Sequence, residues 1–496
     1  MRQKLSDWIA ILLLSVILWS GFAVDANASN DLPQANRRHI LERLSFGITS
    51  EQLEQVNRVG IESYIESQLN PQQVTESKVL EGHLAELDFI RQNPIKNQKK
   101  VQRWRKELQT SKPSNEQLRK RRKEIREFNN KARDEAIFAQ LARSIYSERQ
   151  LQEVMVDFWF NHFNVFADKG ASALWLSDYA NRIRTHALGN FRDLLGVTAR
   201  HPAMLIYLDN KKNTAPDSPA GKKQKLGLNE NYARELMELH TLGIDGGYTQ
   251  DDVIALARIF TGWGVDLLGK NKNSKSGFLF YKNRHDRQEK SFLGHKIAPN
   301  GIEEGEQALD ILANHPATAH FISYKLAQYF VADRPPLSLV DKLSREFTES
   351  QGDIKQVLNV LIHSEEFNDP QYYKQKFKTP YQYLISSVRM AEIEQPNFKR
   401  IQGMLTQLSM PLYMCAAPTG YKNTQDAWLN PQAMLQRTSL ATAIANGALN
   451  REYSIKQKQL NQNFGELSAN TKQALTKTPP KLRSALILGS PEAMYR

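Results

Sequence analysis

Helical periodicity is the feature that most constrains the fold of this chain. Apolar residues recur every third or fourth position through most of the sequence, as Ile137, Leu141 and Ile145 do, and this spacing predicts amphipathic helices. Strand-like alternation is confined to 278–281, which we expect to form a small hairpin with 292–293. The sequence therefore predicts a mainly α fold, a large multi-helical globular domain with a minor β element. Further helices are expected over 151–166, 173–188, 228–242, 249–261, 316–331, 337–350, 354–363, 380–393 and 431–446.

The composition is that of a chain that folds around a sizeable core. It has 496 residues, of which 41% are hydrophobic and 24% charged, and this excludes a wholly disordered protein. Cys415 is the single cysteine, so disulfides within the chain and metal sites built from several cysteines are excluded. Stability must therefore come from packing.

The first 28 residues have the features of a bacterial secretory signal. Arg2 and Lys4 precede an apolar run over 9–24, and the small residues of 26–28 follow as a cleavage site. The run of 16 residues is shorter than the ~20 that span a bilayer, which favours a cleaved signal over the alternative, a membrane anchor. We expect an exported protein, periplasmic or extracellular, that begins at Ser29.

The chain after the signal 1–28 divides into two predicted parts. A helical domain is expected over 29–450, with a basic helical hairpin inserted at 96–133, and a C-terminal helical extension over 451–496. His201 and His315 each precede a proline and are expected to mark helix starts, because proline suits the first turn of a helix.

The predicted hairpin carries most of the positive charge of the chain. Residues 96–133 contain 15 Lys and Arg against four acidic residues, a local net charge of +11 within a total of +13. The break at 111–115 contains a proline and separates two basic helices. Their apolar residues form only a narrow stripe, consisting of Val101, Trp104, Leu108, Leu118, Ile125 and Phe128.

Such a hairpin is suited to an anionic partner. An anionic polysaccharide or a lipid headgroup would be bound by charge neutralisation, which weakens as salt rises. Nucleic acid is not expected, because export separates the chain from it and no nucleic-acid-binding signature is found. A solvated helical face remains the alternative. The candidate anion-binding residues are Arg119, Lys120, Arg121, Arg122 and Lys123.

Several long motifs resemble those of one bacterial family, the domain of unknown function 1800 family. The longest runs from Asn229 to Gly243 and reads NENYARELMELHTLG, and it is followed by ARIFTGW at 257–263. The other similar stretches are Trp159–Phe163, 187–191, His201–Met204, Leu208–Asn210, and His285–Asp286 before Leu293–Gly294. The resemblance covers about His39 to about Gly447.

The resemblance implies a largely helical exported protein with no settled activity. It also implies an envelope or polysaccharide context, with a sulfatase-like exported protein as a candidate partner. The chain departs from the family pattern at Thr419, within the stretch 417–421, where the family usually carries Asp. If that acid is needed for chemistry, the departure puts the activity of this chain in doubt.

The main motif supplies the candidate catalytic residues Glu235, Glu238 and His240. A helical spacing of about 100° per residue puts His240 on an apolar face and Glu238 on a charged one. A core histidine is the alternative interpretation of His240. Together with Asp209, His285 and Asp286, His240 is also a candidate ligand for a divalent metal, with zinc, manganese or iron as the candidate cofactor.

Two functions follow as hypotheses. The first is a hydrolase-like enzyme that acts on an envelope or extracellular polymer. The second is a non-catalytic envelope binding or assembly module that engages an anionic polymer or a partner protein through its basic hairpin. Gly-x-Ser-x-Gly and His-Glu-x-x-His are both absent, which counts against two common hydrolase classes.

Overall fold

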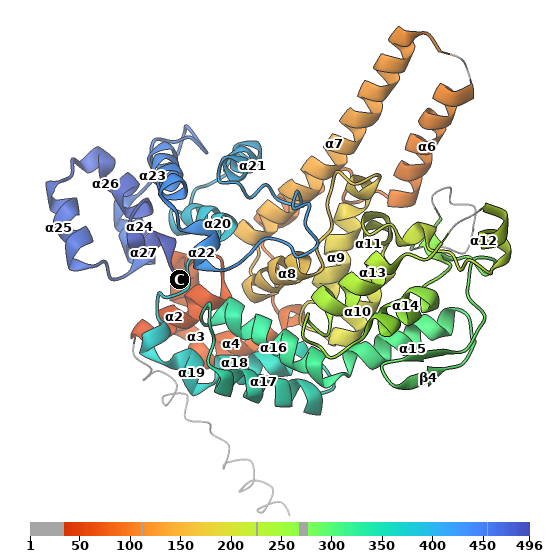
Figure 1. The fold of residues 1–496 in the computed structure, drawn as a ribbon. Coiled ribbons are helices and arrows are strands. Elements are labelled where there is room, and N and C mark those ends of the chain that lie inside the picture. Colours follow the sequence, from red (N-terminus) through yellow and green to blue (C-terminus); the bar gives the residue numbers. More distant parts are fainter. Residues whose placement is uncertain (1–33, 111–112, 225–226, 267–275, 454) are drawn as a thin grey trace, which may run out of the picture.

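The structure is a computed structural model that describes residues 34–110, 113–224, 227–266, 276–453 and 455–496. In these ranges the fold is mainly α with two small antiparallel sheets, which confirms the predicted class (Figure 1). The expected signal, 1–28, lies outside the described residues. None of the described helices is both long and apolar enough to cross a membrane.

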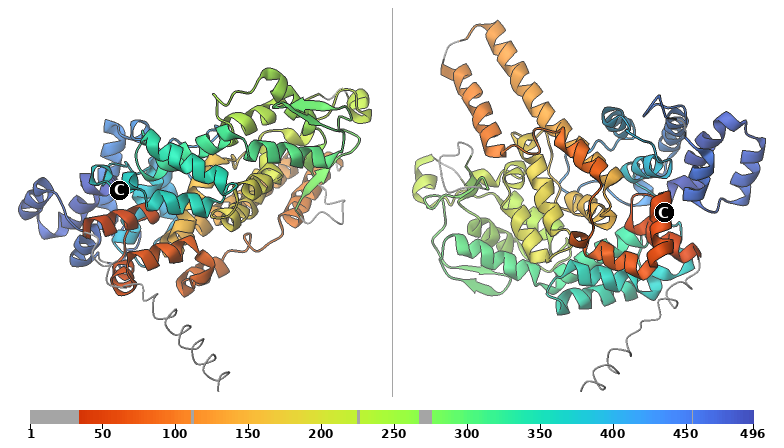
Figure 2. Two further views of the ribbon diagram at one scale, coloured as in Figure 1. Left: turned by 90° about the horizontal axis from the view of Figure 1, so that it is seen from below. Right: turned by 180° about the vertical axis from the view of Figure 1, so that it is seen from behind.

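The N-terminal part consists of short helices followed by a long helical hairpin. The short elements are α2 (Gln34–Leu44), α3 (Ser50–Val59), α4 (Ile61–Leu69), η2 (Pro71–Gln73) and α5 (Lys78–Ala85). They are followed by α6 (Pro94–Thr110) and α7 (Asn115–Tyr146), whose free ends project from the body in Figure 1 and in the right-hand view of Figure 2. The predicted protruding basic hairpin is therefore confirmed.

The helix α7 belongs to the hairpin and to the core at once. Ser114 caps its N-terminus in a capping box with Gln117, so the helix begins at the break predicted from the proline. Its outer half is mostly exposed, whereas Ala136, Leu141 and Ile145 are buried. One uninterrupted helix thus joins the tip of the hairpin to the interior.

The centre of the chain forms short helices around the motif region. His201 accepts a hydrogen bond from the Ala203 backbone N–H at 3.1 Å and caps α11, which confirms it as a helix start. The elements are α8 (Gln150–His162), η3 (Ser172–Trp175), α9 (Leu176–His186), α10 (Phe191–Ala199), α11 (Pro202–Tyr207), η4 (Asn210–Lys212), α12 (Pro219–Gln224), α13 (Glu230–Glu235), the π turn η5 (Leu236–His240) and α14 (Gln250–Ile259).

The strands form two hairpins, so the predicted pairing of 278–281 with 292–293 is wrong. β2 (Phe278–Phe280) pairs with β1 (Trp263–Val265), and β3 (Lys290–Phe292) pairs with β4 (His295–Ile297). The cause is the turn between β3 and β4, where Leu293 and Gly294 both have positive φ, at 47° and 78°. Two such residues make the tight turn that closes a local hairpin.

The remaining chain is helical to its end. Helices predicted over 316–331, 337–350, 354–363 and 431–446 end within two residues of their predicted limits. The elements are α15 (Ile302–Ala313), α16 (Pro316–Phe330), α17 (Leu337–Glu349), α18 (Ile354–Ile362), α19 (Glu365–Asn368), η6 (Pro370–Tyr372), α20 (Pro380–Met390), α21 (Phe398–Gln407), α22 (Gln425–Trp428), α23 (Pro431–Ala445), α24 (Gln457–Phe464), α25 (Ala469–Lys477), α26 (Pro480–Leu488) and α27 (Pro491–Met494).

A single hydrophobic core connects both ends of the described chain. Every residue of α20 is buried, and this helix contacts α7, α21, α24 and α27. Leu460 and Leu488 of the C-terminal segment are fully buried in the same core as Leu44 of α2. The helices of segment 455–496 pack on the body (Figure 1).

Candidate functional site

The loop 410–423, between α21 and α22, is fastened to α8 by asparagine side chains. The Asn161 amide donates to the Tyr421 carbonyl oxygen at 2.8 Å, and the Tyr421 N–H donates to Asn161 Oδ1 at 2.7 Å. Asn164 donates to two further carbonyl oxygens of the loop, at 3.0 and 2.8 Å. A Cβ at Gly420 would lie 2.3 Å from the Asn161 carbonyl oxygen, so this close approach requires glycine.

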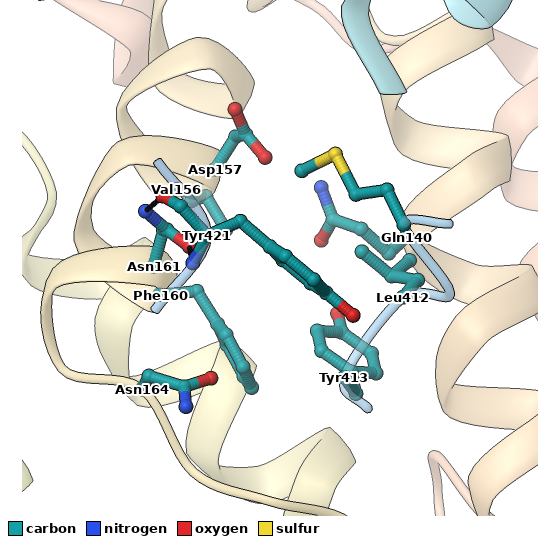
Figure 3. Close-up of a pocket in the computed structure, with 10 residues that line it drawn as sticks. Gln140, Val156, Asp157, Phe160, Asn161, Asn164, Leu412, Tyr413 and Tyr421 are labelled. Atoms are coloured by element: carbon teal, nitrogen blue, oxygen red, sulfur yellow. Dashed lines mark hydrogen bonds between the residues drawn. The ribbon is translucent and has the colours of Figure 1, made fainter. Parts of the chain in front are cut away.

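Two small cavities, each of about 30 Å³, lie between this loop and α8. We call them the Asp157 cavities. Figure 3 shows the first, which also touches Gln140 of α7, while His162 and Lys325 line the second. Cavities of this size hold water or a very small ligand. Both are lined by Asp157, Asn161, Met410 and Tyr421.

Asp157 has the properties of an acid that titrates near neutral pH. The Tyr329 hydroxyl donates to Asp157 Oδ2 at 3.0 Å, and the Gln382 amide donates to the Tyr329 oxygen at 3.1 Å. Burial raises the pKa of Asp157 to about 6, although the hydrogen bond from Tyr329 and the charge of Arg496 oppose the rise. This carboxyl group can therefore both accept and release a proton under physiological conditions.

His162 lines the second cavity, His240 lies against His162 with ring centres 6.0 Å apart, and both are buried. His162 Nε2 lies 3.1 Å from the His240 carbonyl oxygen. Because a carbonyl oxygen only accepts, Nε2 carries the proton and His162 Nδ1 is left with a lone pair. Among the described residues, neither His162 Nδ1 nor His240 Nε2 has a hydrogen-bond partner. Burial holds the pKa of His162 well below its usual value and lowers that of His240 to about 3, so both rings are neutral.

Lys325, on α16, brings an amine to the second cavity. Its Nζ lies 5.2 Å from the centre of the Phe321 ring. Burial lowers the pKa of the amine to about 8, and no hydrogen bond or ion pair of this amine is found with the described part of the chain. The positive charge of Lys325 also helps to keep His162 and His240 neutral.

The motif candidates Glu235, Glu238 and His240 all lie outside the linings of the two cavities. His240 closes the π turn η5 and is buried, whereas both carboxylates are only partly buried and line neither cavity. Glu238 forms an ion pair with Arg234 at 3.5 Å. Burial, reinforced by the charge of Glu238, raises the pKa of Glu235. The candidate histidine is therefore buried, whereas the candidate acids are partly exposed.

Asp209 lies instead on an open groove of about 570 Å³, lined by Tyr207, Asn229, Asn231 and Pro418 among others. Its carboxylate forms an ion pair with Lys169 at 2.9 Å. The backbone of Asp209 has a φ of 58°, in the left-handed region that costs a non-glycine residue free energy. The groove is therefore a second place where motif residues meet.

His285 and Asp286 belong to a buried network at the β3–β4 hairpin. His285 Nε2 lies 2.9 Å from Glu304, and Lys290 Nζ donates to the same carboxylate at 2.7 Å. Asp286 forms ion pairs with Arg258 at 3.4 Å and with Lys290 at 3.6 Å. These groups thus form hydrogen bonds and ion pairs with one another.

The four candidate metal ligands are therefore not assembled into one site. Asp209 pairs with Lys169, His240 packs behind His162, and His285 and Asp286 share the network at Glu304. In the described ranges, no three His, Cys, Asp or Glu residues are grouped so that they could hold a metal ion. The donor set does not fit the expected divalent metal.

The hairpin is held together by an aromatic seam. Trp104 and Phe128 meet edge to face with ring centres 5.5 Å apart, and Lys100 Nζ lies 4.7 Å from the centre of the Phe128 ring. Arg121 bridges the two helices, since it pairs with Glu107 at 3.2 Å and with Glu124 at 2.7 Å. The predicted stripe is thus the contact surface between α6 and α7, and Arg121 is part of it.

The outer face of the hairpin is covered by cations. Arg119, Lys120, Arg122 and Lys123 are all exposed. Lys123 has a weak pair with Glu127 at 3.8 Å, whereas no ion pair of the other three is formed within the described part of the chain. Further exposed cations without such a pair are Lys96, Lys99, Arg103, Lys106 and Arg126.

Sequence reasoning missed Asp157 and Lys325. Lys325 is the one Lys, Arg, Asp or Glu residue in 316–331, which was an available signal, whereas Asp157 shares 151–166 with the equally acidic Glu153 and does not stand out. Cys415 is buried, and burial raises the pKa of its thiol.

The helices and the loop 410–423 define a mainly α protein. The chain belongs to the family described as "Protein of unknown function (DUF1800)", which it matches over residues 39–495. The match includes the segment 451–495 that follows the predicted helical domain. No curated protein and no solved structure matches the chain.

Proposed function

We propose that this protein is exported and binds an anionic polymer or headgroup surface of the cell envelope through the α6–α7 hairpin. The observation that supports it is a group of exposed cations, most of them without an ion pair to any described residue, on a hairpin that projects from the body (Figure 1). Unpaired surface cations attract a polyanion at a range of about 10 Å at 0.1 M salt, and projection lets both helices approach it.

The shape of the hairpin favours binding over a purely solvated face. The aromatic seam holds α6 and α7 together without using the outward cations, because Arg121 forms the ion pair with Glu107 of α6 and a second pair with Glu124 within α7. The free cations therefore do not stabilise the hairpin. Their mutual repulsion is relieved when they meet an anionic partner.

Binding to acidic polysaccharide and to anionic lipid vesicles would test this proposal. In the variant, Arg119, Lys120, Arg122 and Lys123 are changed to Gln, while Arg121 is kept to preserve the hairpin. The matched control changes Lys399, Lys458, Lys477 and Lys481 to Gln, four exposed lysines elsewhere on the surface. We expect the first variant to lose retention on polygalacturonate or phosphatidylglycerol vesicles at low salt, and the control to keep it.

Equal retention of both variants would overturn the proposal. Retention on polygalacturonate alone would identify a polysaccharide as the partner, and retention on vesicles alone would identify lipid headgroups. Circular dichroism of both variants checks that the hairpin remains helical. Fractionation of the full-length protein, with sequencing of its N-terminus, tests export and cleavage before Ser29.

A second candidate function is hydrolysis in the groove beside Asp209. The groove has a volume of about 570 Å³, within the usual range of ligand sites, and the carboxylates of Asp209 and Glu230 both line it. Two carboxylates are the residue types that general acid and base catalysis of polymer hydrolysis uses. Release of reducing ends from envelope polysaccharide should fall in Asp209→Asn at an unchanged melting temperature. Unchanged release would remove this candidate.

A further inference from the structure

We propose that Lys325 is a nucleophilic amine that forms an imine with a small aldehyde or ketone in the second Asp157 cavity. Three features support this: the amine lines the cavity, it lacks a hydrogen-bond partner in the described part of the chain, and Asp157 lines the same space. This site is distinct from the hairpin and does not depend on it.

Lys325 is only partly buried, and three buried lysines show what an occupied amine looks like in this protein. Lys290 Nζ donates to Glu304 at 2.7 Å, and Lys378 Nζ donates to the Ala493 carbonyl oxygen at 3.1 Å. Lys376 is ion-paired with Asp333. Lys325 instead lies over the Phe321 ring, at 5.2 Å from its centre. Its amine is therefore free to react once it loses its proton.

Burial also makes that proton easy to lose. The pKa of Lys325 is lowered to about 8, so a measurable fraction of the amine is neutral at physiological pH. His162 Nδ1 carries a free lone pair and His162 lines the same cavity, so it can accept a hydrogen bond from the amine or from bound water. A cavity of about 30 Å³ limits the carbonyl compound to a few carbon atoms.

The reaction balances with groups on the cavity wall. The neutral Lys325 amine attacks the carbonyl carbon, a C–N bond forms, and the carbonyl oxygen takes a proton to give a carbinolamine. The nitrogen then loses its remaining proton, the C–O bond breaks and one water leaves, which gives the imine. Asp157 donates the proton to the departing oxygen and is reprotonated by the proton that the nitrogen releases. With a carboxyl pKa of about 6, it is suited to both transfers.

Reductive trapping tests the proposal on the wild-type protein. The folded protein is incubated with pyruvate or glycolaldehyde and sodium cyanoborohydride, digested, and mapped by mass spectrometry for reduced adducts at each lysine. We expect Lys325 to be modified about tenfold or more faster than Lys376 and Lys378, two buried lysines whose pKa is also lowered to about 8. The rate at Lys325 should be half-maximal near pH 8.

Asp157→Asn separates the role of the acid from a structural one. It keeps the shape of the side chain, and we expect it to slow adduct formation at Lys325 by about tenfold or more at pH 7, as loss of a general acid does. The adduct at exposed Lys399 should form at an unchanged rate. Absence of an adduct at Lys325, or equal modification of Lys376 and Lys378, would overturn the proposal.

Discussion

Two buried polar clusters in this molecule differ in how completely their groups are paired. Around Glu304, the carboxylate accepts from Lys290 and interacts with His285, and the backbone N–H groups of Asn300 and Gly301 donate to it at 2.9 and 3.0 Å. Around Asp157, Lys325 has no such partner in the described ranges and two histidine nitrogens are unpaired.

We infer from this difference that the Glu304 network has a structural role and the Asp157 cavities a chemical one. A fully paired buried network fixes the fold locally, because every removal leaves a charge without its partner. An incompletely paired cluster beside a cavity costs stability and is kept where it has another use. The Glu304 network therefore anchors the β3–β4 hairpin, whereas the Asp157 cavities are the place where we infer reactivity.

The largest expected effect is the loss of Glu304. Glu304→Ala leaves the buried Lys290 ammonium and His285 without their carboxylate, and we expect a loss of about 3–5 kcal/mol in the free energy of unfolding. Urea denaturation at pH 7 measures it. Glu303→Ala, at an exposed neighbour on the same helix, serves as the control and should stay within about 0.5 kcal/mol. A loss below about 1 kcal/mol at Glu304 would show that this network is not anchoring.

The next effect concerns the pH dependence that Asp157 contributes. Its pKa is raised to about 6 in the folded protein, so the folded state binds the proton more tightly than the unfolded state does. The contribution of Asp157 to the free energy of unfolding is therefore fully present below about pH 4 and is lost as the pH rises through about 6. The difference in free energy of unfolding between Asp157→Asn and the wild type should therefore shift by about 2–3 kcal/mol in favour of the variant from pH 4 to pH 7. Urea unfolding at both pH values measures this shift. A constant difference would contradict the raised pKa.

A matched pair of histidine variants compares the two clusters directly. His285→Leu removes one of the partners of the Glu304 carboxylate and the ring nitrogen that faces the Thr261 carbonyl oxygen, and it should cost about 1–3 kcal/mol more than His240→Leu. At His240 an unpaired nitrogen is replaced by an apolar group of similar size, which is nearly neutral. Thermal unfolding of both proteins at pH 7 measures the difference. Equal losses would mean that pairing does not distinguish the clusters.

The smallest expected effect on the free energy of unfolding concerns two arginines on the surface of the hairpin. Arg121→Gln removes two ion pairs between and within the helices, at 3.2 and 2.7 Å, and should cost about 0.2–1 kcal/mol. Arg122→Gln removes an exposed cation that pairs with no described acid and should cost nothing measurable. The difference should shrink at 1 M salt in urea titrations, because salt screens surface charges.

Most of the fold was predictable from the sequence because helices are local. Apolar spacing located the helices of the second half, and Pro202 and Pro316 marked two helix starts. The strand pairing was missed because it depends on the positive φ of Leu293, a residue type that seldom adopts it.

The candidate site was only partly predictable, because its groups come from three distant segments. His162 and His240 stand out in their motifs, but their neutrality follows from burial that no spacing reveals. Asp157 and Lys325 are 168 positions apart and share a cavity only through packing of α8, α16 and the loop 410–423. His285 is part of a similar motif and was a candidate ligand, yet it is occupied by Glu304.

The length of α7 has a mechanical consequence. The helix runs for 32 residues, about 48 Å at the usual rise, and in its inner half Gln140 lines the first Asp157 cavity. Its outer half projects from the body, whereas its inner half packs among α5, α9, α20 and α21. Because α7 is uninterrupted between the tip of the hairpin and the cavity wall, we expect a force applied at the tip to be transmitted along the helix to the cavity.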